Sequence, residues 1–376
     1  MILQTLDIKN NCAGAFINDI LLIEPSIEDM EKCNLAWKYS PTLNDEKYTY
    51  LYVLNRGEEL SNYSSDPSAY LSSEERIKAH HKAALTAKVD ASDSCFFDMV
   101  PNHQLKDYFI NRYHAMANLS EKVPIPKDYG ILHKIHVISE KIRKQGIQYR
   151  GQIQSINYDI FGTATGRLTT KKSSLPILTL KREDRVSLTP SNDLFVELDF
   201  NAAEVRMLLA LSGKSQPSGD IHLYLEGQIF KKSSNRDKFK EKLFAWLYNP
   251  NSQEDAFNSL LDKSVYLDFY DTEHNILETP FSRKLKVDER KALNYLLQSS
   301  TSDQVLENTY RIQKILENKR SKVSFTLHDS VVLDMAKEDA KLLPEIKRLF
   351  EQTRWGRFMS TCKVGKNFGE LKDIEI

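Results

Sequence analysis

An apolar run that ends beside a carboxylate constrains the fold of this 376-residue chain more than any other feature. Residues 194–200 read Leu-Phe-Val-Glu-Leu-Asp-Phe, and from Ala202 onward the apolar residues recur with helical spacing. An aspartate at the end of a strand, here Asp199, lies where a divalent cation could be held. The pattern therefore predicts a strand, an exposed carboxylate and a helix, in that order.

A second carboxylate stands in a similar setting much later in the chain. Residues 323–327 alternate between apolar and polar, the polar pair His328-Asp329 interrupts them, and a second apolar run follows. This predicts a β-hairpin with Asp329 at its tip. Two carboxylates on one sheet can hold the two divalent ions that activate a hydroxyl and stabilise a leaving phosphate. Taken singly, either aspartate is better explained as a turn or cap residue.

Between the two aspartates, Arg236, Lys240, Phe244 and Tyr248 recur at intervals of four residues. Each step of four residues drifts by about 40° around a helix, so the four side chains share one face. Two cations can bind a triphosphate and two rings can stack on a base. The alternative is an ordinary amphipathic helix whose cations face water and whose rings lie in the core.

Two weaker patterns flank these elements. Arg290, Asn294 and Gln298 form a second ladder at intervals of four, and such donors could contact the minor-groove acceptors that every base pair presents. Thr165 and Arg167 lie in a turn rich in glycine and threonine, where Arg167 could contact phosphate or the minor groove. Helix polarity explains the ladder about as well, and a plain turn explains the second pattern equally well.

Composition excludes several classes of protein. Hydrophobic residues make up 41% of the chain and charged residues 28%, which excludes collagen-like and disordered chains. The length predicts two or three domains, and no apolar run approaches the roughly 20 residues of a membrane helix. The four cysteines lie far apart without a C-x-x-C pair, so the sequence favours a reducing, cytoplasmic setting over a zinc or disulfide framework.

The charge balance hides a local excess. The chain has 52 basic and 52 acidic residues, yet residues 134–185 contain eleven basic residues and only four acidic ones. Such a stretch could follow a phosphate backbone. A solvated helix face with its loops is a slightly better explanation from charge alone.

Taken together and in this order, these elements resemble the family A DNA polymerases, particularly compact phage members, over roughly residues 150–370. The resemblance implies an α+β polymerase right hand with an antiparallel-sheet palm, helical fingers and a helical thumb. The expected divisions are a small β-containing lobe at 1–72, the thumb at 73–150, palm segments at 151–226 and 296–376, and fingers at 227–295.

The resemblance also implies roles for particular residues. Asp199 and Asp329, with Phe200 beside them, would form the site of two Mg²⁺ ions, for which Mn²⁺ could substitute, and Lys240 would join the two aspartates in catalysis. Glu204 would exclude a 2′-hydroxyl. The residues expected to bind the incoming nucleotide are Arg236, Lys240, Phe244, Tyr248, Glu204 and His222. The residues expected to contact DNA are Arg167, Thr165, Arg283, Arg290, Asn294, Gln298 and His328.

The sequence also departs from the family pattern. Ser330 follows Asp329 where an acidic residue is usual, and Ser282 precedes Arg283 where glycine is usual. Ala245 and Asn249 occupy positions on the fingers helix where the family prefers glycine. Ser299 follows Gln298 where glycine is usual. None of these changes removes a metal ligand or a phosphate-binding cation.

The expected reaction is templated addition of dNTPs to a primer 3′-end in DNA replication, in the cytoplasm of a bacterium or phage-infected cell. Primer-template DNA and dNTPs are the expected partners, with a replisome or a separate exonuclease as further ones, and no membrane. The segment before the predicted helical region is short for a proofreading domain, and Asp271-Thr-Glu273 is interpreted as a turn. A single-subunit RNA polymerase, which Glu204 argues against, and a catalytically inactive DNA-binding relic are the alternatives.

Overall fold

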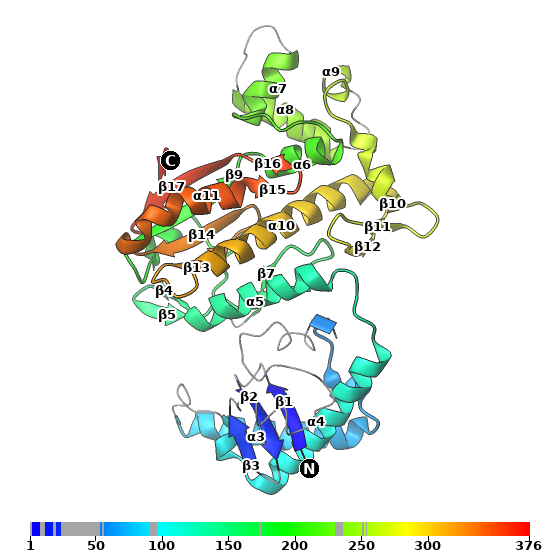
Figure 1. The fold of residues 1–376 in the computed structure, drawn as a ribbon, viewed down its shortest axis with the longest axis vertical. Coiled ribbons are helices and arrows are strands. Elements are labelled where there is room, and N and C mark those ends of the chain that lie inside the picture. Colours follow the sequence, from blue (N-terminus) through cyan, green and yellow to red (C-terminus); the bar gives the residue numbers. More distant parts are fainter. Residues whose placement is uncertain are drawn as a thin grey trace. The chain divides into compact units, whose positions relative to one another are not determined.

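The computed structural model describes residues 2–7, 12–17, 20–23, 53–54, 56–89, 96–172, 174–229, 236–249, 252 and 254–376. The chain forms two compact units, Met1–Tyr129 and Gly130–Ile376, which are described separately (Figure 1). The boundary falls inside the segment 73–150, which the sequence pattern assigns to a single thumb.

The first unit begins with a three-stranded antiparallel sheet in the order β1-β2-β3, formed by Ile2–Asp7, Cys12–Ile17 and Ile20–Ile23. The short apolar runs at 15–17 and 20–23, separated by turn residues, predict two strands, which the structure confirms. A similar run at 48–54 predicts a further strand, but residues 48–52 lie outside the described residues and Val53 and Leu54 are helical. The short helix η2 (Leu60–Tyr63) follows.

Ser73, which precedes Glu74 and Glu75, predicts a helix that begins there, but helix α3 (Pro67–Thr86) begins earlier. Asp66 is the actual cap: its carboxylate accepts a hydrogen bond from the N–H of Ala69 at 2.9 Å, and Pro67 occupies the first turn. Ser73 lies inside the helix, where its hydroxyl donates to the carbonyl of Tyr70. The capping prediction was wrong because Asp66 followed by proline is the stronger start signal.

Helix α3 packs on α4 (Asn102–Lys122), with the short helix η3 (Phe96–Met99) beside them. Their shared core is aromatic, because Phe97 contacts Phe109 edge-on at 5.1 Å and Tyr108 at 5.8 Å. This core belongs to the first unit alone.

The second unit is built around a five-stranded antiparallel sheet in the order β13-β14-β9-β17-β18. Its strands are β9 (Leu194–Phe200), β13 (Lys322–Thr326), β14 (Ser330–Met335), β17 (Ser360–Gly365) and β18 (Lys372–Ile374). The predicted strand at 194–200 and the predicted hairpin at 323–335 are therefore confirmed. Antiparallel sheets mixed with helices also confirm the predicted α+β class.

Helices cover one face of this sheet (Figure 1). Helix α10 (Glu289–Ile315) contacts β13 and β14, and α11 (Leu343–Glu351) contacts β9 and β17. Phe200 of β9 stacks on Phe350 of α11 with ring centres 4.3 Å apart, so even-numbered residues of β9 face the helices. Alternation then turns Glu197 and Asp199 toward the opposite face.

The remaining elements of the second unit surround this sheet. Along the sequence, α5 (Tyr129–Gln145) and η4 (Asp184–Ser187) precede β9. Two small sheets also precede it: one of β4 (Ile147–Tyr149), β5 (Gln152–Gln154) and β8 (Leu188–Thr189), and one of β6 (Tyr158–Asp159) and β7 (Thr169–Thr170). After β14 come η6 (Lys337–Leu342) and the pair β15 (Gln352–Thr353) and β16 (Gly356–Arg357).

The chain between β9 and α10 contains several helices among its described residues. They are α6 (Ala203–Leu211), α7 (Ile221–Ile229), α8 (Arg236–Tyr248), α9 (Asp255–Asn258) and η5 (Lys263–Phe269), followed by the sheet of β10 (Tyr270–Asp271), β11 (Ile276–Glu278) and β12 (Lys284–Lys286). Asp271 accepts hydrogen bonds from the N–H groups of Glu273 and His274, which confirms the turn predicted there. Within the described residues, no helix is both long and apolar enough to cross a membrane.

Candidate active site

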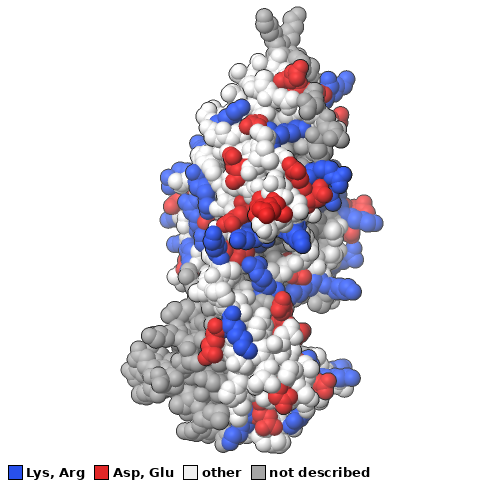
Figure 2. All heavy atoms as spheres, turned by 90° about the vertical axis from the view of Figure 1, so that its right-hand side faces the viewer, with Lys and Arg blue, Asp and Glu red and all other residues white. Residues whose placement is uncertain are grey.

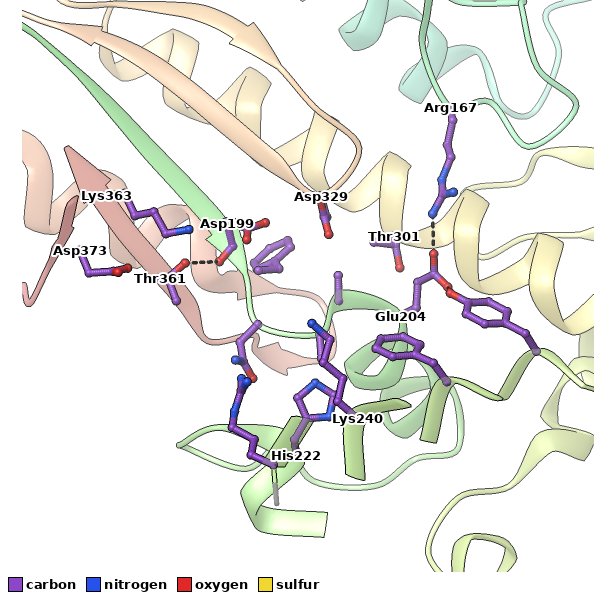
Figure 3. Close-up of a pocket in the computed structure, with 17 residues that line it drawn as sticks. Arg167, Asp199, Glu204, His222, Lys240, Thr301, Asp329, Thr361, Lys363 and Asp373 are labelled. Atoms are coloured by element: carbon purple, nitrogen blue, oxygen red, sulfur yellow. Dashed lines mark hydrogen bonds and ion pairs between the residues drawn. The ribbon is translucent and has the colours of Figure 1, made fainter. Parts of the chain in front are cut away.

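A cavity of about 620 Å³ lies in the second unit where β9 ends (Figure 3). Its wall is formed by the end of β9 with the start of α6, the tip of the β13–β14 hairpin, the helices α7, α8 and α10, and the strands β17 and β18. Ten of the residues singled out from the sequence line this cavity: Arg167, Asp199, Phe200, Glu204, His222, Arg236, Lys240, Phe244, Tyr248 and Asp329.

The two aspartates predicted at a strand end and a hairpin tip meet here. Asp199 pairs with Ser330 across β9 and β14, and the N–H of Phe200 donates to the carbonyl of Asp329 at 3.2 Å. Burial raises the pKa of Asp199 to about 7, and the nearby carboxylates of Asp329 and Glu197 act in the same direction. The site therefore concentrates negative charge that the protein compensates only in part, with nearby lysines opposing the rise.

This donor set fits a hard divalent cation. The carboxylates of Asp199 and Asp329 supply oxygen ligands, which Mg²⁺ prefers, and a cation would relieve their repulsion. Phe200 can contribute only through its backbone, because its side chain is buried and its ring is stacked on Phe350. In the described part of the chain no group of three or more Asp, Glu, His and Cys side chains could hold a metal, so the pair would have to share ligands with substrate or water.

The i+4 face of α8 is turned toward the cavity. The buried face of this helix is formed by other residues, Phe239, Leu243, Trp246 and Leu247. By contrast, Arg236, Lys240 and Tyr248 are exposed and Phe244 is half-buried. Phe244 and Tyr248 are stacked, with ring centres 5.9 Å apart and planes 10° apart. The amphipathic alternative expects the two rings in the core, but they line the cavity and a separate set of apolar residues forms the core; the exposed cations fit either interpretation.

Glu204, in the first turn of α6, is held from two sides. Its carboxylate accepts a hydrogen bond from Arg167 at 2.5 Å and another from the hydroxyl of Tyr248. Burial raises the pKa of the Tyr248 hydroxyl, and the charge of Glu204 raises it further, so Tyr248 stays a donor. The carboxylate is thereby fixed at the cavity wall, as the labelled residues in Figure 3 show.

His222 lies beside α8 at the cavity wall. Its side chain is 2% exposed and its ring lies 6.0 Å from that of Phe244. Burial lowers the pKa of His222; the charge of Asp220 opposes this shift, and the charges of Arg236 and Lys240 add to it. Neutral His222 can therefore offer one donor and one acceptor in a basic corner of the cavity.

Two of the residues predicted to contact DNA are buried away from this cavity. Thr165 is 7% exposed, and Arg283 is 5% exposed in a two-bond ion pair with Asp303. A guanidinium that is held in this way has little surface left to offer a nucleic acid.

The other predicted DNA contacts outside the cavity are more accessible. Arg290 is exposed and pairs with Asp288, while Asn294 and Gln298 follow it along α10 with partial exposure. His328 lies beside the catalytic candidate Asp329 with part of its surface in solvent, and the partial desolvation of its ring, together with nearby Arg167, lowers its pKa. The contacts of these residues with DNA stay predictions.

The basic stretch at 134–185 is partly paired with acids. Ion pairs engage five of its basic residues: Lys134, Lys141, Arg143, Arg150 and Arg167. On the side drawn in Figure 2, blue and red side chains alternate over short distances. The stretch alone therefore offers less free positive charge than its composition suggests.

Several residues of the site escaped the sequence interpretation. Thr301 of α10, Thr361 and Lys363 of β17, and Asp373 of β18 also line the cavity; β17 pairs with β9, and β18 pairs with β17. Nothing local in their sequence marks them. Asp220 could have been noticed, since it precedes the apolar start of α7 at a typical cap position.

Comparisons with known proteins add a structural likeness. No protein-family model matches the sequence, and no curated protein matches it either. Among solved structures, the chain is similar to the POL domain of Pol1 from M. smegmatis in complex with a DNA primer-template and dNTP, with a TM-score of 0.49 and 12% identity. The match covers 85% of this chain and 66% of that chain, so this chain spans slightly less than two thirds of its length.

Proposed function

We propose that this protein is a template-directed DNA polymerase of the family A type, which adds dNTPs to the 3′-end of a primer. The observation that carries the proposal is the cavity itself. It brings an aspartate at a strand end, an aspartate at a hairpin tip, two cations and two stacked rings of one helix, and a fixed glutamate into a single space of about 620 Å³. These groups come from distant parts of the sequence, from Arg167 to Asp329, and only the fold unites them.

Each group has a task in this reaction. The primer 3′-oxygen attacks the α-phosphorus of the dNTP, the bond to the β-phosphate breaks, and diphosphate leaves. Divalent ions held by Asp199 and Asp329 would lower the pKa of the attacking hydroxyl and neutralise the leaving phosphates. The two cations of α8, which line the cavity, would bind the triphosphate, and its two rings would stack near the nascent base pair.

The proposal also assigns the palm, fingers and thumb of a polymerase right hand to elements of the chain. The five-stranded sheet would be the palm, and α7, α8 and α9 the fingers. The thumb would draw on α3, α4 and α5, which the unit boundary at Tyr129 divides.

Primer extension by the purified protein, with Mg²⁺ and either dNTPs or rNTPs, tests the function directly. Extension with dNTPs supports the proposal. Extension with rNTPs alone favours an RNA polymerase, and DNA binding without extension favours the relic.

Glu204 supports deoxynucleotides as the substrate. Its carboxylate is fixed by Arg167 and Tyr248, so it cannot move aside for a 2′-hydroxyl. Glu204→Ala is expected to reduce discrimination against rNTPs by roughly 10- to 100-fold, as expected when a small steric block is removed. The measurement is the ratio of kcat/KM for dNTP and rNTP. Glu204→Gln has nearly the same size and is expected to keep most of the discrimination; an unchanged ratio in Glu204→Ala would remove this residue from the gate.

Phe244 leads to a prediction about the 3′-position of the sugar. Its ring lines the cavity and carries no hydroxyl that could replace a missing 3′-hydroxyl. Wild-type protein is therefore expected to select against dideoxynucleotides, and Phe244→Tyr to relax this selection by about tenfold or more, because the new hydroxyl replaces one lost hydrogen bond. Competition between dNTP and ddNTP in primer extension measures it. Equal selection by both proteins would place Phe244 away from the sugar.

A further inference from the structure

A carboxylate with no assigned role holds Arg236 from outside the cavity. Asp220 Oδ2 accepts hydrogen bonds from Arg236 Nε at 3.1 Å and from Nη2 at 2.6 Å. Arg236 lines the cavity, whereas Asp220 does not. These two bonds leave the Nη1 group and the second N–H of Nη2 unused; Nη1 lies 3.6 Å from the carboxylate of Asp237, whose side chain is 84% exposed.

Asp220 is itself rigidly held. Its Oδ1 accepts the N–H groups of His222 at 2.8 Å and Leu223 at 3.1 Å, which caps helix α7. Its Oδ2 also accepts from Asn201 Nδ2 at 3.3 Å. Burial would raise the pKa of Asp220, but the hydrogen bonds from Arg236 and from the N–H of Leu223 outweigh burial and hold the pKa below its ordinary value.

Asn201 extends this chain of contacts to the strand that carries Asp199. Its side-chain oxygen accepts the N–H of Ile221 at 3.1 Å, and its backbone N–H donates to the carbonyl of Met359 at 2.8 Å. The side chains of Asp220 and Asn201 thereby connect Arg236, the first residue of α8, to the end of β9.

We propose that Asp220 is a positioning residue that fixes Arg236 for the outer phosphates of the incoming nucleotide. This inference rests on the proposed function and deepens it. An arginine side chain that is 42% exposed would otherwise sample many rotamers and lose that freedom on binding. Asp220 removes this loss in advance, and because it leaves the other N–H groups of the guanidinium unused, it does not compete with the ligand.

Asp220→Asn is the sharpest test, because asparagine caps helices about as well as aspartate but removes the charge that holds Arg236. The probes are a dNTP, inorganic triphosphate and the matching dNMP, each titrated with Mg²⁺ at physiological salt. We expect the Kd of the dNTP and of triphosphate to rise about tenfold, the equivalent of ordering one long side chain. The Kd of the dNMP is expected to stay within twofold, and the melting temperature to stay unchanged.

The matched control is Asp237→Asn. Asp237 also lies near Arg236, at 3.6 Å from Nη1, but its side chain is 84% exposed. It is expected to change none of the three affinities by more than twofold. In an Arg236→Gln background Asp220→Asn should likewise have no further effect, because the group that it positions is gone.

The outcomes separate the inference from the function. Unchanged or tighter triphosphate binding by Asp220→Asn would overturn the positioning role, since the carboxylate would then be neutral or a competitor. Equal weakening of all three ligands would also overturn it, because that result indicates a general structural defect. Wild-type protein that binds triphosphate as expected but extends no primer would refute the proposed function and leave the role of Asp220 standing.

Discussion

Replacement of Asp199 or Asp329 by asparagine is expected to lower primer extension by on the order of 10³-fold, since each removes a charged ligand worth several kcal/mol of transition-state stabilisation. Asp199 pairs with the residue after Asp329 across adjacent strands. Neither change alters side-chain size, so the sheet and the affinity for duplex DNA are expected to persist. Single-turnover extension measures the loss.

Asp199→Asn is expected to lower activity but not the free energy of unfolding. The raised pKa of Asp199, about 7 against an ordinary 3.8, means that its charge costs folding free energy increasingly as pH rises from about 4 through 7. In metal-free buffer at pH 8, Asp199→Asn should therefore be at least as stable as wild type, measured by denaturant unfolding.

For the activity measurement, Asp373→Asn is the matched control, because it changes a carboxylate at another part of the cavity wall, and it is expected to lose less than tenfold activity. Near wild-type extension by Asp199→Asn or Asp329→Asn would disprove the metal assignment.

The second large effect is expected on stability rather than on chemistry. Arg283 Nε donates to Asp303 at 2.6 Å and its Nη2 donates at 2.8 Å, with both side chains almost fully buried. Removal of one partner leaves the other charge buried, so Asp303→Asn or Arg283→Met should lower the free energy of unfolding by about 3–5 kcal/mol. Denaturant titration of each variant measures the change.

The pair Arg320 and Glu338 provides a control, because its side chains are 65% and 54% exposed at a separation of 3.1 Å. Breaking it is expected to cost about 1 kcal/mol or less. The double variant Arg283→Met, Asp303→Leu should recover most of the lost stability, since neither charge is left without a partner. A loss below about 1 kcal/mol for the single variants, which is the range of an exposed pair, would show that the buried pair is not a structural anchor.

The burial of Arg283 is a feature that local sequence patterns could not predict. Short-range periodicity predicted the strand with Asp199, the hairpin with Asp329 and the helix with the two stacked rings, because each pattern lies within a single element or hairpin. The pairing of Arg283 with Asp303 joins a loop to the middle of α10, and no periodicity carries that information. A guanidinium interpreted from the sequence as a DNA contact is therefore part of an internal ion pair.

Local sequence patterns also could not identify residues that position another side chain or that reach the cavity through contacts between distant segments. Asp220 gains its place only because α7 and α8 bring it beside Arg236, which lies on the next helix. Lys363 and Asp373 reach the cavity because β17 pairs with β9 and β18 pairs with β17. The unit boundary at Tyr129 likewise depends on contacts between distant segments, which lie beyond local pattern.

The order of strands in the five-stranded sheet affects how the chain can fold as it is synthesised. β9 is complete at Phe200, but its two neighbours begin only at Ser330 and Ser360. Until these are made, the backbone N–H and C=O groups of β9 have no sheet partners, and its apolar side chains lack α11. Nascent or truncated chains that end before Ser330 are therefore expected to associate with one another, and chaperone binding during translation should concentrate in this interval.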